Sequence, residues 1–167
     1  MMGIPTALLA LLASAASLLD PPPFAPLVGP VDRVLIQKGD RELFLIQDGW
    51  PVRMYPVALG FAPEGDKTRQ GDGRTPEGVF RVDRRNESSQ FHLSLGLDYP
   101  HPEHRERAAK AGHSPGGDIF IHGQPPGTPE GTWYSVDWTR GCVAIADAHM
   151  DVLWEHVPLG TEVEITP

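Results

Sequence analysis

Residues 118–143 read DIFIHGQPPGTPEGTWYSVDWTRGCV and contain the only cysteine of the chain. The apolar run at 119–121 predicts a short strand that delivers His122 at its end. A loop rich in proline and glycine follows over 123–138, and Cys142 then stands at the start of a short apolar segment. Because this loop can turn the chain back, we expect His122 and Cys142 to meet.

This pairing favours nucleophilic catalysis by Cys142. A thiolate nucleophile needs a base or a cationic partner, and histidine titrates in the range that such a base requires. Gly141 permits close backbone approach, and successive N–H groups in such a turn can hold an oxyanion. The charge of Arg140 favours thiolate over thiol. The alternatives are a lone cysteine packed as a small apolar residue and a histidine of the core or surface.

The rest of the chain is rich in strand patterns. Apolar, β-prone runs bounded by Gly and Pro predict seven strands, at 34–36, 43–46, 52–59, 78–82, 91–95, 118–122 and 161–165. Two helices are predicted, at 102–111 and at 147–156, the second capped by Asp147. Strands and helices do not alternate, so a mainly β fold is favoured over a doubly wound α/β fold.

Composition limits the class of protein. The 167 residues are enough for one domain with a hydrophobic core. A net charge of −8 without a basic stripe argues against nucleic acid as a partner, and a single cysteine excludes a disulfide within the chain. We predict no cofactor and no metal, because His101 and His104 around Glu103 are typical of a polar surface patch. The sequence leaves the oligomeric state undetermined.

The beginning of the chain is typical of a targeting segment. Residues 4–19 are almost all apolar, with small residues at 13–15 as a cleavage signal and prolines at 21–23 that break any helix. No Lys or Arg precedes the apolar run, which is short for a membrane span. We therefore predict export to the periplasm, with a signal peptide at 1–20, a linker at 21–30 and a catalytic domain at 31–167. An uncleaved membrane anchor and a misassigned start codon are the alternatives.

Two motifs resemble one known family. Ile121-His122-Gly123, the sixteen residues of 123–138, and Thr139-Arg140-Gly141-Cys142-Val143 resemble the signature of the L,D-transpeptidase (YkuD-type) catalytic domain. Thr75-Pro76-Glu77-Gly78 before a predicted strand is similar to a second motif of that family. The only cysteine thus stands where the family has its nucleophile.

The resemblance covers residues 31–167. The stretch 91–95 with Tyr99-Pro100 resembles a compact branch of the family in Gram-negative bacteria. The implied fold is a mainly β sandwich with mixed sheets, one or two short helices and a long loop at the catalytic site.

The resemblance also implies roles for site residues. Cys142 would be the nucleophile, His122 its base, and the carbonyl of Gly123 would orient the histidine ring. Gly141 and Thr139 would shape the oxyanion hole.

We further predict substrate contacts by Arg140, His92 and Tyr134. The alternative for His92 is a half-buried position in an apolar strand. For Tyr134, with Trp133 and Trp138, the alternative is a small cluster that rigidifies the loop.

The implied function is peptidoglycan L,D-transpeptidation, in which a stem peptide is carried on Cys142 and transferred to an amine, either of another stem or of an envelope lipoprotein. Two positions depart from the family pattern: Arg140 stands where histidine is frequent, and Ala144 where Asn or Arg is frequent. Because both lie in the substrate cleft of relatives, two alternatives stay open. One is a hydrolase on the same fold that cuts peptidoglycan amides or lipoprotein links, and the other is a wall-binding module without catalysis.

Overall fold

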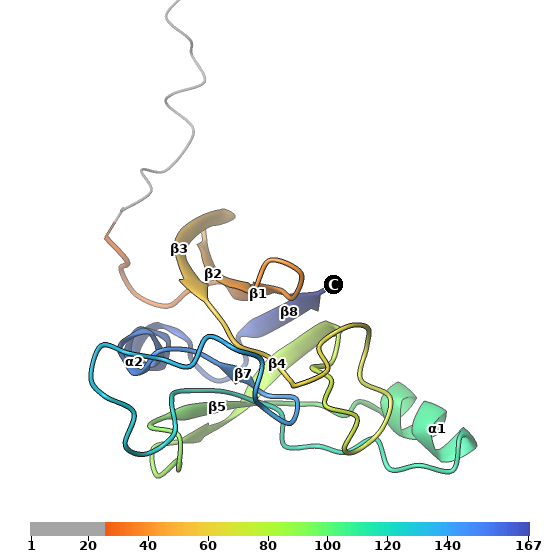
Figure 1. The fold of residues 1–167 in the computed structure, drawn as a ribbon. Coiled ribbons are helices and arrows are strands. Elements are labelled where there is room, and N and C mark those ends of the chain that lie inside the picture. Colours follow the sequence, from red (N-terminus) through yellow and green to blue (C-terminus); the bar gives the residue numbers. More distant parts are fainter. Residues whose placement is uncertain (1–25) are drawn as a thin grey trace, which may run out of the picture.

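The computed structural model describes residues 26–167, so the predicted signal peptide lies outside the described residues. The described chain forms one curled, mixed β-sheet flanked by two short helices (Figure 1). The strands are β1 (Arg33–Gln37), β2 (Glu42–Gln47), β3 (Trp50–Pro56), β4 (Gly78–Asn86), β5 (Ser94–Leu97), β6 (Phe120–His122), β7 (Val143–Ala144) and β8 (Glu162–Thr166). The helices are α1 (Pro102–Lys110) and α2 (Asp147–His156).

The sheet has the strand order β3-β2-β1-β8-β4-β5-β6-β7. The pairs β1–β8 and β6–β7 are parallel, and the other neighbours are antiparallel. Strand β4 belongs to both halves, because 78–81 pairs with β8 and 82–86 pairs with β5. The predicted mainly β fold with mixed strand pairing is confirmed, and its two layers are halves of one curled sheet.

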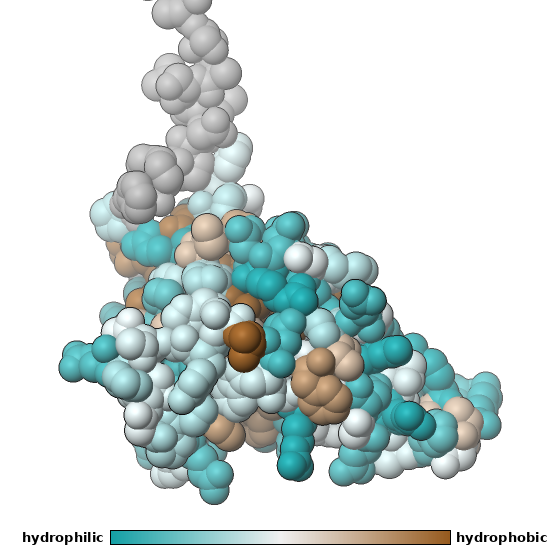
Figure 2. Space-filling view, viewed as in Figure 1, coloured by the Kyte–Doolittle hydropathy of each residue, from teal (hydrophilic) through white to brown (hydrophobic). Residues whose placement is uncertain are grey.

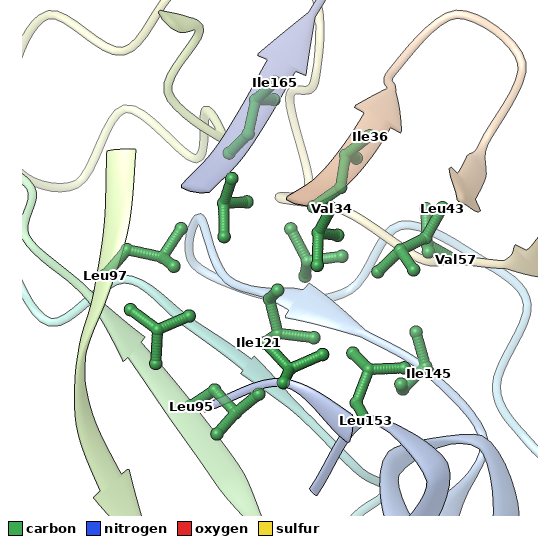
Figure 3. Packing of buried hydrophobic residues seen from close by; sticks show 14 of the residues in the cluster. Val34, Ile36, Leu43, Val57, Leu95, Leu97, Ile121, Ile145, Leu153 and Ile165 are labelled. Atoms are coloured by element: carbon green, nitrogen blue, oxygen red, sulfur yellow. The ribbon is translucent and has the colours of Figure 1, made fainter. Parts of the chain in front are cut away.

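The core lies between these halves. Ile36 of β1 and Ile165 of β8 face Leu95 of β5 and Ile121 of β6 across it (Figure 3). All four side chains are at most 1% exposed. Burial of one such side chain stabilises a fold by about 1.5–3 kcal/mol, so this layer holds the two halves of the sheet together.

The segment after β3 crosses from one edge of the sheet to the other. The predicted strand at 52–59 is wrong in its bounds, because β3 covers Trp50–Pro56 and its bonding toward the β2 side ends with the N–H of Val57, which donates to the carbonyl of Arg41 at 2.9 Å. Ala58 instead exchanges two backbone hydrogen bonds of 2.8 Å with Ala144 of β7. This crossing carries the following loop to the start of β7, where Cys142 lies.

The predicted strand at 91–95 is wrong in its first part. Strand β5 begins only at Ser94, and its four residues are all buried rather than alternating. His92 has a φ of 66°, a left-handed conformation that is foreign to a strand. Strand β4 is longer than predicted, since its exposed polar residues at 83–86 pair with β5 without an apolar pattern.

Both predicted helices are present. Helix α2 buries Met150, Leu153 and Val157 at its end against the core, as its apolar pattern predicts. The expected cap by Asp147 is wrong, because Ala146 is the N-cap and makes no side-chain cap. The Asp147 carboxylate instead accepts the backbone N–H of Gln124 at 2.7 Å. Neither of the described helices is long and apolar enough to cross a membrane.

Candidate active site

The pairing of β6 with β7 brings His122 and Cys142 together. These strands are parallel neighbours, with His122 opposite Ala144. In this register Cys142, just before β7, lies beside the start of β6, and the side chains of His122 and Cys142 line one cavity of about 290 Å³. The structure brings the two residues to one cavity, and their catalytic roles stay predictions.

Backbone and aromatic contacts orient the His122 ring. Its Nδ1 lies 2.7 Å from the carbonyl oxygen of Gly123, which can only accept, so Nδ1 carries the proton and Nε2 is left as a base. Phe91 stacks on the ring at 4.6 Å and Trp138 meets it edge-on at 5.7 Å. Burial lowers the pKa of His122, although its hydrogen bond to Gly123 acts in the opposite direction. The ring is therefore neutral at neutral pH.

The Cys142 thiol is protonated in the resting site. Burial raises its pKa; the charge of Asp118 adds to this, while the Phe120 N–H and the charge of Lys67 oppose it. The Sγ lies 3.4 Å from the carbonyl oxygen of Asp118, to which the S–H donates. The expectation that Arg140 favours the thiolate is wrong, since burial prevails and the opposing side-chain charge is that of Lys67. A neutral thiol beside a neutral imidazole needs the base to act at the moment of attack.

The turn before Cys142 depends on glycine. Gly141 has a φ of 136°, and a Cβ there would lie 2.7 Å from the carbonyl oxygen of Arg74, so no other residue fits without displacement. Its N–H donates to Thr139 Oγ1 at 3.1 Å, and the Thr139 hydroxyl donates to the carbonyl of Cys142 at 2.7 Å. Thr139 thus holds the turn. Because the N–H of Gly141 already donates to Thr139, it is not free to bind an oxyanion, which differs from the prediction. The N–H of Cys142 is then the donor of this turn that can bind the oxyanion.

A second cavity of about 370 Å³ reaches Cys142 from another side. Lys67 and Arg140 line it, and Asp118 lines both cavities. The Lys67 ammonium lies 2.8 Å from the carboxylate of Asp72, with both side chains at most 8% exposed. Burial would raise the pKa of Asp72, but the Lys67 hydrogen bond and three backbone N–H donors lower it to about 2. One charged and one aromatic cavity therefore meet at the sulfur.

These features agree with a match to a known family over most of the chain. The family model of the L,D-transpeptidase catalytic domain, YkuD, matches residues 31–165. The chain belongs to this L,D-transpeptidase family. A search of curated proteins found no match.

Solved structures share the fold of this L,D-transpeptidase domain. An L,D-transpeptidase from Xylanimonas cellulosilytica is 20% identical with a TM-score of 0.55, covering 84% of this chain and 63% of that chain. The helical cell shape determining protein Pgp2 from Campylobacter jejuni is 25% identical with a TM-score of 0.62, covering 82% and 48%. A mutant L,D-transpeptidase from Enterococcus faecium is 16% identical with a TM-score of 0.55, covering 83% and 50%. The chain thus spans about half to two thirds of each of these proteins.

The motif at 75–78 supports the nucleophile turn. Thr75 is fully buried, and its Oγ1 accepts the N–H of Gly60 at 3.1 Å. The buried ammonium of Lys38 donates to the carbonyl of Thr75 at 3.0 Å and to Glu77 at 2.8 Å. These bonds fix the backbone of the loop that packs on Gly141.

Two polar residues of the long loop hold it in place although no sequence pattern predicts this. The buried Gln124 donates to the carbonyl of Ile145 at 2.7 Å and accepts the N–H of Tyr134 at 2.8 Å. Asp137 accepts the N–H of Leu59 at 2.8 Å and pairs with Arg41 at 2.8 Å. Their partners lie far away in the sequence, so no local pattern marked them.

The structure places two predicted substrate contacts outside the cavities at Cys142. His92 lines neither cavity, and its Nε2 lies 2.6 Å from a carboxylate oxygen of Asp151 on α2. Tyr134 lines neither cavity and is 51% exposed, with its ring 6.5 Å from Trp138. Arg140 alone of the three lines a cavity with Cys142, and contacts of His92 and Tyr134 with substrate stay predictions.

One histidine cluster could offer metal ligands. Ligand atoms of His101, Glu103 and His104 all lie within 4.8 Å of one another. His104 Nδ1 accepts the N–H of His101 at 3.1 Å, and His101 Nε2 lies 3.0 Å from Asp98. His104 Nδ1 thus helps to hold the start of α1, and the expectation of a surface patch is wrong for His104, which is buried.

Proposed function

We propose that this domain is a peptidoglycan L,D-transpeptidase that carries a stem peptide on Cys142 as a thioester and transfers it to an amine in cell-wall remodelling. The observation that carries the proposal is the His122 ring beside Cys142, with Nδ1–H donated to Gly123 and Nε2 left as the base. A cysteine, a base and a group that orients the base are the parts that acyl transfer requires.

Acylation begins with a neutral thiol. His122 Nε2 takes the thiol proton while Sγ attacks the carbonyl of the third residue of a stem tetrapeptide, a diamino acid. The bond from that carbonyl to the nitrogen of D-Ala breaks, and His122 returns the proton to the leaving amine. The peptide is then held by a thioester bond to Cys142.

The tetrahedral intermediates carry a negative oxygen. The backbone N–H of Cys142 has no acceptor among the described residues, and Gly141 and Thr139 hold this N–H in place. Loss of one such donor reduces transition-state stabilisation by about 3 kcal/mol in other acyl-transfer enzymes. The rigid turn is therefore part of the proposed catalysis.

In the second half-reaction, an acceptor amine attacks the thioester carbonyl and His122 takes a proton from that amine. The carbon–sulfur bond then breaks, and His122 returns the proton to Sγ of Cys142, which restores the neutral thiol. Transfer to an amine of another stem gives a crosslink, and transfer to an amine of an envelope lipoprotein gives an attachment. Similarity to a protein named for helical cell shape supports a role in remodelling the wall. Periplasmic action also belongs to this proposal and rests on the targeting pattern of residues 1–20.

The test is to incubate the purified protein with a defined tetrapeptide muropeptide and to identify the products by mass spectrometry. We expect crosslinked dimers and free D-Ala. Tripeptide without dimers would contradict transfer in favour of hydrolysis, and unchanged substrate would contradict catalysis in favour of binding alone.

The matched control is Cys142→Ala, which we expect to reduce turnover at least about 10³-fold because it removes the nucleophile. Its thermal unfolding is measured alongside, so that loss of fold is separated from loss of chemistry. Turnover retained by this variant would overturn the assignment of Cys142.

A further inference from the structure

A basic cavity lies next to the charged side of the site. Its volume is about 600 Å³, and its lining includes the guanidinium groups of Arg69, Arg74 and Arg107 together with His113. They come from the loop between β3 and β4 and from the end of α1 and the segment after it. This concentration of positive charge occurs in a chain whose net charge is −8.

Among the described residues 26–167, two of these guanidinium groups have no carboxylate partner. Arg107 pairs with Asp66 at 2.7 Å, and the one acidic residue of the lining, Asp72, is already paired with Lys67. Arg74 donates only to a backbone carbonyl, at 3.2 Å, and the Arg69 side chain has no hydrogen bond or ion pair within residues 26–167. The partial negative charge at the carboxyl end of α1 explains why a cation, Arg107, stands in its last turn. It does not explain Arg69 and Arg74, which lie on a loop.

The basic cavity adjoins the charged cavity at Cys142. Gly71 lines both the basic cavity and the charged cavity at Cys142. The backbone of Arg74 packs on Gly141, as the carbonyl oxygen 2.7 Å from a Cβ placed there indicates. Figure 1 shows the loop of 61–77, in yellow, between α1 and the segment before β7, and Figure 2 shows that the face in this view is mostly hydrophilic.

We propose that this basic cavity binds a free carboxylate of a stem peptide whose reacting group lies at Cys142, through the guanidinium groups of Arg69 and Arg74. This inference rests on the proposed function, since it assumes that a stem peptide is the substrate. Guanidinium groups bind carboxylates through two parallel hydrogen bonds, which give both energy and orientation. The cavity would orient the substrate at a distance from the reacting atoms.

The variant that tests this is Arg69→Gln in the full chain. The Arg69 side chain makes no hydrogen bond or ion pair within residues 26–167, so the variant should keep its stability. The matched control is Arg105→Gln, an exposed position on α1 that lines neither the basic cavity nor the cavities at Cys142. Both substitutions are combined with Cys142→Ala so that the peptide stays intact, and dissociation constants are measured by isothermal titration calorimetry.

The ligands are a tetrapeptide muropeptide with free carboxylates, the same muropeptide with its carboxylates amidated, and inorganic phosphate. We expect Arg69→Gln to weaken binding of the free-carboxylate peptide about tenfold, with no change for the amidated peptide and no change in Arg105→Gln. Arg69→Lys should recover part of the affinity, because it restores charge without the planar fork.

Equal affinities of Arg69→Gln and Arg105→Gln for the free-carboxylate peptide would overturn the proposal. Phosphate binding that depends on Arg69, without such dependence for the peptide, would overturn it in favour of a phosphate ligand. The assay is independent of turnover. An Arg69-dependent affinity in a protein that produces neither dimers nor tripeptide would sustain the cavity and refute the proposed function. Turnover in a protein whose affinity for the peptide does not depend on Arg69 would support the proposed function and refute the role of the basic cavity.

Discussion

The two cavities that meet at Cys142 differ in what lines them. The aromatic cavity contains Phe91, Phe120 and His122, whereas the charged cavity contains Lys67 and Arg140. Aromatic burial keeps the histidine neutral and ready to accept a proton, since desolvation disfavours its charged form. The charged cavity leads instead to the basic cavity through Gly71. The two sides of one sulfur therefore differ in chemistry: the proposed proton transfer belongs to the aromatic side, and the proposed recognition of a substrate carboxylate belongs to the charged side.

The largest expected effect comes from the base on the aromatic side. His122→Gln should lower kcat by about 10²–10⁴, because general-base catalysis is lost while a polar side chain remains. The measurement is turnover of the tetrapeptide muropeptide. The matched control is His156→Gln, because His156 Nδ1 also lies 2.7 Å from a glycine carbonyl, that of Gly29, far from Cys142 in the fold. An equal decrease of kcat in both variants would contradict the assignment of His122 as the general base.

A smaller effect is expected from the ion pair on the charged side. Lys67→Met should lower the free energy of unfolding by about 3 kcal/mol, because the buried carboxylate of Asp72 loses its cation. Denaturant unfolding measures this. Lys110→Met, which removes an exposed pair with Glu106, should cost within about 0.5 kcal/mol.

The effect of Lys67→Met on the free energy of unfolding should depend on pH. The pKa of Asp72 is lowered to about 2, below its ordinary value of about 3.9, so the ionised carboxylate stabilises the fold above pH 4 and this contribution is lost as pH falls toward 2. The difference between Lys67→Met and the parent chain should therefore shrink over that window. A difference independent of pH would assign the effect to packing rather than charge.

The smallest expected effect concerns the ring stacked on His122. Phe91→Leu should let more water reach the histidine and raise its pKa toward the ordinary value of about 6.5. Catalysis needs the neutral ring, so activity rises with pH through this pKa, and the acid limb of kcat/KM should move upward by less than about one pH unit. Phe44→Leu on β2 makes the same chemical change outside the cavity. An acid limb that stays in place would exclude Phe91 as the group that sets it.

Sequence patterns predicted the parts that depend on local order. The spacing of His122 and Cys142 and the glycine between Arg140 and the cysteine predicted the nucleophile, its base and a tight turn. The apolar face of α2 followed from helical periodicity. The strand at 91–95 was wrong because His92 turns the chain although its neighbours alternate. Such a turn is imposed by tertiary contacts, among them the bond from the N–H of Gly123 to the carbonyl of Phe91 at 2.9 Å.

Other errors concern partners. Arg140 stands beside Cys142 in the sequence, yet Lys67 is the cation that acts on the thiol. The N–H of Gly141 was expected at the oxyanion, but Thr139 takes it. Asp147 was expected to cap α2, but it binds Gln124. For Arg140 and Asp147, a charge and a hydrogen bond were assigned to a neighbour in the sequence, whereas folding supplied a distant partner. For Gly141, a donor expected to be free for the substrate is used within the turn itself.

By itself the sequence determined the family and the mainly β fold, and it predicted Cys142 and His122 as the reacting pair, because these depend on residue types at set spacings and on periods of two or 3.6. The tertiary structure alone decided which groups surround that pair. It placed Phe91 on the histidine ring, Lys67 near the sulfur, and Arg69 with Arg74 in one cavity. Loops converge through contacts between distant residues, which no local pattern encodes, and this is why the sequence yielded the nucleophile but not its surroundings.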